Sequence, residues 1–310
     1  MRPLHRVRLH GRQRRRRRPR RGARPARGGP LGGPGAGGVT GPRLGAGARL
    51  SALVLLLASL TAALGLLVPR EKAYRIDLGA RLVPPRAGAP LGTDELGRSL
   101  AWRLVVGASV SLGVAATAVA VSATLGSFLG LLAGERGGAA DAALGRVVDL
   151  VLAFPGLLLA VALAAVLGPS AANTVVALSV VGWVPYARLS RTEARRVSSL
   201  DYVASARALG ASRLRLLGRH LLPNVAAPLV VQATLHLAGA ILAESALSFL
   251  GLGVPPPAPS WGAMLAAGRT HVLDAPHVVL APAVAILLVV VATNVLGDAL
   301  VARLQRVRHA

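Results

Sequence analysis

The most unusual polar side chain of this sequence is Glu244, which lies inside the long apolar run Val225–Leu250. An ionised carboxylate at the centre of a lipid bilayer costs roughly 2.5–3.5 kcal/mol. We therefore expect Glu244 to face an aqueous path, a partner subunit or a polar neighbour such as His236 or Gln232, unless it lies at the depth of the lipid headgroups. Hydrogen bonding and ion pairing are the chemistry open to such a residue.

The other reactive side chains form no catalytic or metal-binding set. The chain has no Cys, so a disulfide, a zinc thiolate site and a thiol nucleophile are all excluded. No Gly-x-x-x-x-Gly-Lys-Ser/Thr loop is present, and we expect no ATP site in this chain. Neither Ser198-Ser199 nor Ser248 has a nearby His and acid. The histidines are scattered without metal-ligand spacing: His5, His10, His220, His236, His271, His277 and His309. The sequence therefore predicts a non-catalytic chain without a cofactor of its own.

The elements that must position these residues are long apolar helices. Hydrophobic residues make up 53% of the chain, charged residues make up only 15%, and the mean hydropathy is +0.57. A helix needs roughly 20 apolar residues to cross a bilayer. The fold class we predict is all-α, a polytopic membrane protein with about six transmembrane helices near Leu50–Val68, Leu104–Ala133, Val147–Leu167, Ala171–Ala187, Val225–Leu250 and Val278–Val301.

Two details of these stretches matter for the count. The third and fourth are separated only by Gly168-Pro169-Ser170, which predicts a tight turn. The first is short enough to be the core of a signal peptide, but no small-residue cleavage site follows and Pro69-Arg70 ends it abruptly. We interpret it as a retained span, followed by an external loop up to residue 103, with the five remaining spans in residues 104–310.

Arginines gather in three segments that six spans place on one side of the membrane. The first 49 residues carry fifteen Arg and no acid, and residues 188–219 carry eight Arg against Glu193 and Asp201. Because Lys and Arg in short loops stay cytoplasmic, we expect both termini and this loop in the cytoplasm, with residues 74–103 and 254–276 outside. The C-terminal members of the set are Arg303, Arg306 and Arg308.

The Arg-rich segment 1–49 is expected to be a disordered cytoplasmic tail. Its Gly/Pro/Ala/Arg composition cannot bury a core, and Arg14–Arg18 is an unbroken basic run. Such a run attracts lipid or nucleic-acid phosphates, but no aromatic residue is present for base stacking. We favour contact with lipid headgroups over nucleic-acid binding. A start of translation assigned too far upstream is a further alternative.

Between two apolar runs, Asp201–Asn224 has the pattern of a helical elbow. Ser199 or Asp201 caps a first helix and Gly210 ends it. Ser212 then caps a second helix, which we expect to end at Pro223 with its leucines on one face: Leu214, Leu217 and Leu221. An elbow of this kind on one aqueous side of a membrane protein is suited to being pushed from that side.

The elbow resembles the cytoplasmic loop of permease subunits of binding-protein-dependent ABC importers. The family's Glu-Ala-Ala, Gly and Leu-Pro positions are matched here by Ala204-Ser205-Ala206, Gly210 and Leu222-Pro223. The family's acidic residue is missing at Ala204, although Asp201 lies one turn earlier, and His220 replaces an aliphatic residue. The resemblance implies that this loop couples to an ATPase, through the residues Asp201, Ala204, Ala206, Arg207, Gly210, Leu222 and Pro223.

Two further segments resemble the C-type permease subunit of dipeptide, oligopeptide and nickel importers. The first is Gly-Thr-Asp-x-x-Gly-Arg, with Asp94, Gly97 and Arg98 in an external loop. Asp94 and Arg98 could pair there, and in solvent the pair is worth under about 1 kcal/mol. The second runs from Glu244 to a Ser260-Trp261-Gly262 loop. Here the resemblance implies a path or subunit-interface role for Glu244, Ser248, Phe249, Gly251 and Gly253. Trp261 suits an interfacial anchor.

The resemblance, from about Leu50 to the C-terminus, implies a permease that imports peptides by alternating access. Its implied partners are a second permease subunit, two ATPase subunits that bind the ATP, and an extracytoplasmic substrate-binding protein. A nickel importer of the same family is the first alternative. An ion-coupled secondary transporter is another, although such proteins usually have paired ionisable residues at the membrane midplane. A membrane-anchored nucleic-acid-binding protein is a third.

Overall fold

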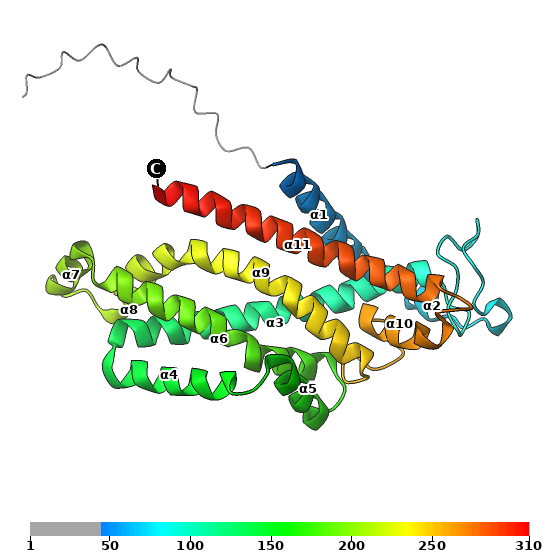
Figure 1. Ribbon diagram of the computed structural model, residues 1–310, viewed down its shortest axis with the longest axis horizontal. Coiled ribbons are helices and arrows are strands. Elements are labelled where there is room, and N and C mark those ends of the chain that lie inside the picture. Colours follow the sequence, from blue (N-terminus) through cyan, green and yellow to red (C-terminus); the bar gives the residue numbers. More distant parts are fainter. Residues whose placement is uncertain (1–44, 310) are drawn as a thin grey trace, which may run out of the picture. The chain divides into compact units, whose positions relative to one another are not determined.

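The structure, a computed structural model, describes residues 45–309, which lie in the unit Pro42–Ala310. Most of the predicted Arg-rich tail lies outside the described residues, and α1 begins at Ala46, within its expected C-terminal end. Every named element of the described part is a helix or helical turn (Figure 1). They are α1 Ala46–Leu67, α2 Arg70–Tyr74, η1 Leu78–Ala80, α3 Leu100–Arg136, α4 Gly138–Leu152, α5 Gly156–Leu167, α6 Ala171–Ser198, α7 Asp201–Ala208, α8 Arg213–Leu216, the π-turn η2 Leu217–Leu221, α9 Leu222–Phe249, α10 Trp261–Gly268, η3 Arg269–His271 and α11 His277–His309.

Four of the predicted spans form helices that are long and apolar enough to cross a membrane. These are α1, α3, α9 together with its preceding turns, and α11. The third predicted span is a bent pair, α4 and α5, which meet at 83° around Pro155 and make a fifth span if counted together. The all-α polytopic class is confirmed, whereas the count of six stays a prediction.

The uncertain sixth span is α6. Its apolar part ends near Ala187, after which the helix continues to Ser198 through the charged residues Arg188, Arg191, Glu193, Arg195 and Arg196. The predicted tight turn before it is present. Gly168 has a left-handed φ of +83°, and the Ser170 hydroxyl accepts a hydrogen bond from the Ala172 N–H at 3.2 Å. The turn thus reverses the chain between α5 and α6, as the sequence predicts.

The most extensive helix packing in the bundle is between α3 and α6. Three glycines at four-residue spacing on α3 face backbone carbonyls of α6: Gly126 faces Trp183, Gly130 faces Ala187 and Gly134 faces Arg191. A Cβ at any of the three would collide with that carbonyl oxygen. Because lipid provides no hydrophobic drive between apolar helices, small residues that let backbones approach are the main source of helix association.

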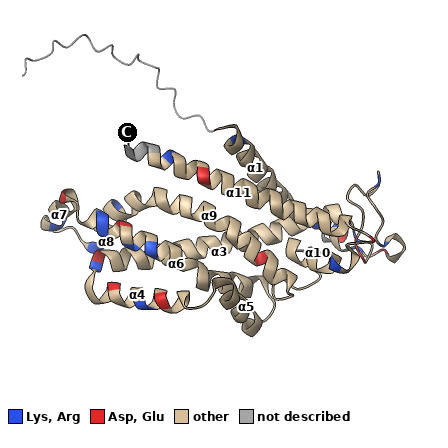
Figure 2. Cartoon of the chain, viewed as in Figure 1, with Lys and Arg blue, Asp and Glu red and all other residues tan. Residues whose placement is uncertain are grey.

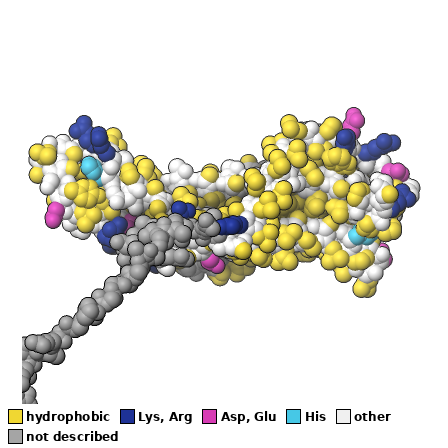
Figure 3. All heavy atoms as spheres, turned by 90° about the horizontal axis from the view of Figure 1, so that it is seen from above, with side chains coloured by type: hydrophobic (Ala, Val, Ile, Leu, Met, Phe, Trp, Pro, Cys, Tyr) yellow, Lys and Arg dark blue, Asp and Glu magenta, His cyan; other side chains and the backbone are white. Residues whose placement is uncertain are grey.

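A second hydrophobic core joins α3 to helices other than α6. Its buried residues come from α3, α9, α10 and α11, and side chains of α1 pack against it. Charged residues gather at the two ends of the bundle, around α7 and α8 and around α2 and the long connections, whereas the helix centres are nearly free of charge (Figure 2). On the face in Figure 3, hydrophobic side chains gather most densely on the half toward α2 and α10. This distribution matches a lipid environment for the middle of the helices.

We expect Gly130→Leu to lower the stability of the protein, because the added side chain must displace the Ala187 carbonyl. Overpacking of this kind costs roughly 1–3 kcal/mol or more. Gly113→Leu on the same helix is the matched control, since a Cβ there meets nothing within 4 Å. Melting of the detergent-solubilised protein, followed by gel filtration, measures the difference. Equal melting of the two variants would contradict the packing argument.

Candidate functional site

The elbow forms at Asp201–Asn224, with differences from the sequence prediction at both ends. The first helix, α7, begins after Leu200, without a side-chain cap from Ser199 or Asp201. It ends at Gly210, whose φ of +83° confirms the expected left-handed turn. The Ser212 hydroxyl caps α8 by accepting from the Arg215 N–H at 3.4 Å. Thus the glycine break and the second cap are where the sequence places them.

The predicted end of the second helix at Pro223 is wrong. The chain continues from α8 through η2 into α9, and Pro223 lies in the first turn of α9. Proline is common in the first turn of a helix, because its fixed φ suits the helical backbone. The single face expected for the leucines is also wrong, since Leu221 is buried while Leu214 is 81% exposed. The elbow therefore leads directly into a membrane span.

A small hydrophobic core fastens the elbow to the long helices α3, α6 and α9. Val203 of α7 is fully buried among side chains from α3, α6, α8, η2 and α9, namely Leu131, Ala194, Val197, Leu216, Leu221 and Val225. Ala206 packs against this core, whereas Ala204 is exposed. Leu209, next to the turning glycine, is 89% exposed. The elbow thus has an anchored inner face and an apolar outer tip.

Polar contacts add to this anchorage. The Arg207 guanidinium lies 3.6 Å from the carboxylate of Glu135 in the last turn of α3. The Tyr202 and His220 rings lie 5.8 Å apart, and the Asn224 amide donates to the Tyr202 hydroxyl at 3.2 Å. His220, the residue that departs from the family pattern, therefore packs between the two limbs of the elbow.

Sequence reasoning missed the ion pairs that hold α4 against α6. Asp141 in the first turn of α4 accepts from Arg191 at 2.5 and 2.8 Å and also pairs with Arg195. About fifty residues separate the partners, so no local spacing signals the pair. The sequence offered one signal for this pairing. Asp141 is an acid in a segment that was expected on the same side of the membrane as the Arg-rich residues 188–219.

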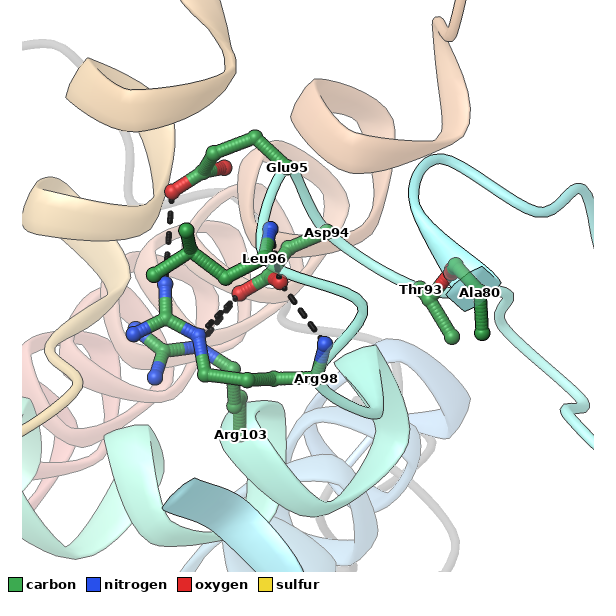
Figure 4. A network of polar contacts seen from close by, with 7 residues as sticks. All are labelled: Ala80, Thr93, Asp94, Glu95, Leu96, Arg98 and Arg103. Atoms are coloured by element: carbon green, nitrogen blue, oxygen red, sulfur yellow. Dashed lines mark hydrogen bonds and ion pairs between the residues drawn. The ribbon is translucent and has the colours of Figure 1, made fainter. Parts of the chain in front are cut away.

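The Asp94–Arg98 pair forms, but it is not the solvated pair that was expected (Figure 4). Asp94 is 3% exposed and accepts from the backbone N–H groups of Leu96 and Arg98 at 3.0 and 2.9 Å. Its other oxygen binds the Nε atoms of Arg98 at 2.7 Å and of Arg103 at 3.3 Å. Because Arg103 is also buried, the Asp94 carboxylate is shared by two cations at the start of α3, and Glu95 provides a second negative charge by pairing with Arg98 at 3.3 Å.

The glycines and threonine of this motif shape the loop around Asp94. Gly97 has a φ of +72°, and a Cβ there would collide with the Asp77 carbonyl. The Thr93 hydroxyl donates to the Ala80 carbonyl at 2.5 Å and accepts from the Val83 N–H at 2.9 Å. These contacts bind residues 77–83 to the motif and make the loop a structured cover over the end of α3.

Glu244 is fully buried within this chain, and its neighbours differ from those expected. Its carboxyl group accepts hydrogen bonds from Ser248 at 2.8 Å and Ser245 at 3.5 Å, two residues of the same helix. His236, the expected neighbour, instead lies 3.1 Å from the Tyr186 hydroxyl. The path or subunit-interface role of Glu244 stays a prediction.

After Glu244 the span ends as the sequence predicts. The helix α9 ends at Phe249, which is half-exposed, and Gly251 follows with a φ of +78°. Gly253 lies against Ser248, where a Cβ would collide with the hydroxyl. Trp261 is buried, and its indole N–H donates to the Leu104 carbonyl at 3.1 Å. The expectation of an interfacial anchor is therefore wrong for Trp261, because its ring packs inside the protein.

The connection between α10 and α11 carries a local polar contact. The His271 ring lies 3.0 Å from the Asp274 carboxylate, and this hydrogen bond lowers the pKa of Asp274 below its ordinary value. Leu273 between them is 97% exposed.

An all-helical membrane protein with an anchored elbow on one side is the class that this geometry defines. Residues 126–308 match the family described as binding-protein-dependent transport system inner membrane component. The chain belongs to this family and is an inner-membrane component of a transport system.

Relatives with established names cover most of the chain. The "Probable D,D-dipeptide transport system permease protein DdpC" of Escherichia coli is 45% identical over 223 residues, 72% of this chain and 75% of the relative. The di/tripeptide transport system permease protein DppC of Pseudomonas aeruginosa is 49% identical over 210 residues, 68% and 69% of the two chains. The glutathione transport system permease protein GsiD of Pectobacterium atrosepticum is 39% identical over 247 residues, 80% and 82% of the two chains.

We expect Asp94→Ala to destabilise the protein strongly, because Arg103 then stays buried without an anion. Removing one partner of a buried pair costs about 3–5 kcal/mol. Asp77→Ala is the control, since Asp77 is exposed and its side chain accepts from the Gly79 N–H at 3.1 Å without an ion pair in the described part of the chain. Thermal unfolding in detergent compares the two variants. A melting temperature of Asp94→Ala equal to that of the control would show that the buried network adds no stability.

Proposed function

We propose that this chain is the permease subunit of an ABC importer that carries peptides across the cytoplasmic membrane. The observation that carries the proposal is the elbow core, in which Val203 of α7 is buried against residues of α3, α6 and α9. A displacement of α7 is thereby passed to three membrane helices at once. Family membership and the peptide transport names of the relatives support the same function.

In the proposed mechanism, two partner ATPases bind ATP and close, and their movement displaces α7. The exposed Leu209 and the small Ala204 give this helix a surface that a partner can approach closely. The Arg207–Glu135 pair gives α7 a second link to α3, in addition to Val203. Because α3 and α6 pack through glycine-to-carbonyl contacts, they move together, and their tilt exposes the transport path alternately to either side.

The remaining parts of the complex follow from the family. A second permease subunit completes the path, and an extracytoplasmic binding protein delivers the cargo to the side of α10 and the Asp94 loop. Peptide is the preferred cargo because peptide or glutathione transport is named for all three relatives. A nickel importer remains the alternative cargo class. Uptake of labelled dipeptide by vesicles containing the whole complex, compared with uptake of Ni²⁺, tests this choice directly.

The coupling role of the elbow predicts a selective defect in Gly210→Val. A β-branched residue at a left-handed φ costs about 1–3 kcal/mol, and the open space around Gly210 leaves backbone strain as the only effect. We expect the variant to assemble with its ATPases but to lose roughly tenfold in uptake per ATP hydrolysed. Reconstituted vesicles measure both rates.

The matched control is Gly218→Val in the same loop. A Cβ at Gly218 also meets open space, but Gly218 has no left-handed φ. We expect nearly normal coupling in this variant. Normal coupling in Gly210→Val as well would remove the mechanical role assigned to the elbow.

The orientation predicts that reporter fusions after Arg196 and after Val301 both lie in the cytoplasm. The physical reason is the excess of Arg in these segments, which resists translocation. A fusion after Leu273 should report the opposite side, because this position lies in the connection on the other end of α11. Phosphatase and fluorescent-protein fusions measure the side. An external signal at Arg196 would overturn the orientation.

A further inference from the structure

We propose that a cavity between α5, α6 and α9 receives an apolar side chain of the peptide cargo, and that His236 bonds to a peptide group of the same cargo. This inference rests on the proposed import function and adds a determinant of specificity within it. The volume of the cavity is about 180 Å³. Since an apolar cavity of about 150 Å³ can hold a benzene molecule, this one has room for a branched or aromatic side chain.

Small residues create this space. Gly239, Ala240 and Ala243 line the cavity from α9, and Ala160 lines it from α5. Leu157, a further lining residue, is 51% exposed, and Gly239 is exposed as well. The cavity therefore opens at the surface of α5 and α9, where a cargo group can enter it. Mostly apolar walls with few polar groups are typical of sites that bind small molecules.

His236 is the one polar side chain among the residues that line the cavity, all of which lie in the described part of the chain. Its Nδ1 lies 3.1 Å from the Tyr186 hydroxyl, and the two rings make an edge contact. Its other ring nitrogen, Nε2, has no hydrogen-bond partner among the described residues. Because a peptide group offers both an N–H and a carbonyl oxygen, Nε2 can bond to it in either tautomer.

A second unpartnered polar atom lies beside the His236 ring. A Cβ at Gly182, which lines the cavity, would lie 2.6 Å from Cε1 of His236 and 2.6 Å from Oγ of Ser122. Ser122 is fully buried, and its hydroxyl has no partner among the described residues. Polar groups without partners are costly inside a span, and an ionisable residue there marks a substrate path. A peptide group that bonds to Nε2 removes this cost for the ring.

Gly239→Leu tests whether the cavity receives a cargo side chain. His236, Gly239 and Ala243 recur at helical spacing, so a side chain at position 239 projects from the face of α9 that lines the cavity. A Cβ there meets nothing within 4 Å, so the leucine enters without a clash at this atom. In vesicles containing the whole complex, we expect the ratio of Leu-Leu uptake to Gly-Gly uptake to fall about tenfold below that of the parent.

The control for this variant is Gly113→Leu. A Cβ at Gly113 also meets nothing within 4 Å, but Gly113 lies on α3 outside the cavity. The uptake ratio should therefore stay at the parent value. All variants are measured with the same binding protein, so a change in the ratio comes from the permease. Co-purification of the ATPases checks the assembly of each complex.

Substitutions of His236 test the contact with the peptide group. His236→Phe should lower uptake of both dipeptides by a similar factor of about ten, because both contain the peptide group that bonds to Nε2. His236→Gln should recover most of this loss, since its amide provides a hydrogen bond near the Nε2 position. Tyr186→Phe removes only the bond between Tyr186 and His236, and it should lose less uptake than His236→Phe.

Two results would overturn the proposal. An unchanged uptake ratio in Gly239→Leu, in a complex that imports both dipeptides, would show that the cavity holds lipid or serves packing. An equal loss in His236→Phe and Tyr186→Phe would show that the His236 ring serves only its contact with Tyr186. If the parent complex imports neither dipeptide, the proposed function fails and this inference fails with it. That outcome is distinguishable because it appears before any substitution is made.

Discussion

The packing of α3 on α6 is the constraint on which the rest of this structure depends. Apolar helices in lipid gain little from burying more apolar surface, so their association requires close backbone approach. Gly126, Gly130 and Gly134 provide it by meeting carbonyl groups of α6. The same two helices also make polar contacts with other elements. Helix α6 provides the arginines that bind Asp141 of α4. Helix α3 provides Glu135, Arg103 and Ser111, which contact Arg207, Asp94 and Trp261 respectively.

Three buried acids, Asp94, Asp141 and Glu244, have different hydrogen-bonding partners according to their position along the bundle. Asp94 pairs with Arg98 and the buried Arg103 at one end, Asp141 binds two arginines near the other, and Glu244 in between accepts from serine hydroxyls, with no ion pair among the described residues. Water is available at the ends of the bundle, where charged groups gather, and ion pairs are tolerated there. In the span a polar group without hydrogen bonds is costly, and the Ser248 hydroxyl provides one to Glu244. Position along the helices thus determines the chemistry of each acid.

The sequence predicted those features that depend on local patterns. Apolar length located the span helices, Gly210 and Gly251 located the turns that require a left-handed φ, and Ser212 located a cap. The errors arose where distant residues decide the outcome. Pro223 did not end its helix because η2 continues into α9, Trp261 became a core residue because α3 and α10 meet, and the partners of Asp141 lie about fifty residues away.

The two sides of the protein are built for different mechanical tasks. The Asp94 loop and the seat of α10 are fixed by several buried hydrogen bonds each, so that side keeps a constant shape. Within the elbow, the helix α7 has one fully buried side chain, Val203, one longer ion pair, Arg207 with Glu135, and the contacts of Tyr202 with His220 and Asn224. A part with few anchors moves at a lower free-energy cost than the bundle that it joins. In the proposed mechanism, a force applied to the elbow would therefore displace α7 first and reach the long helices through the packed core.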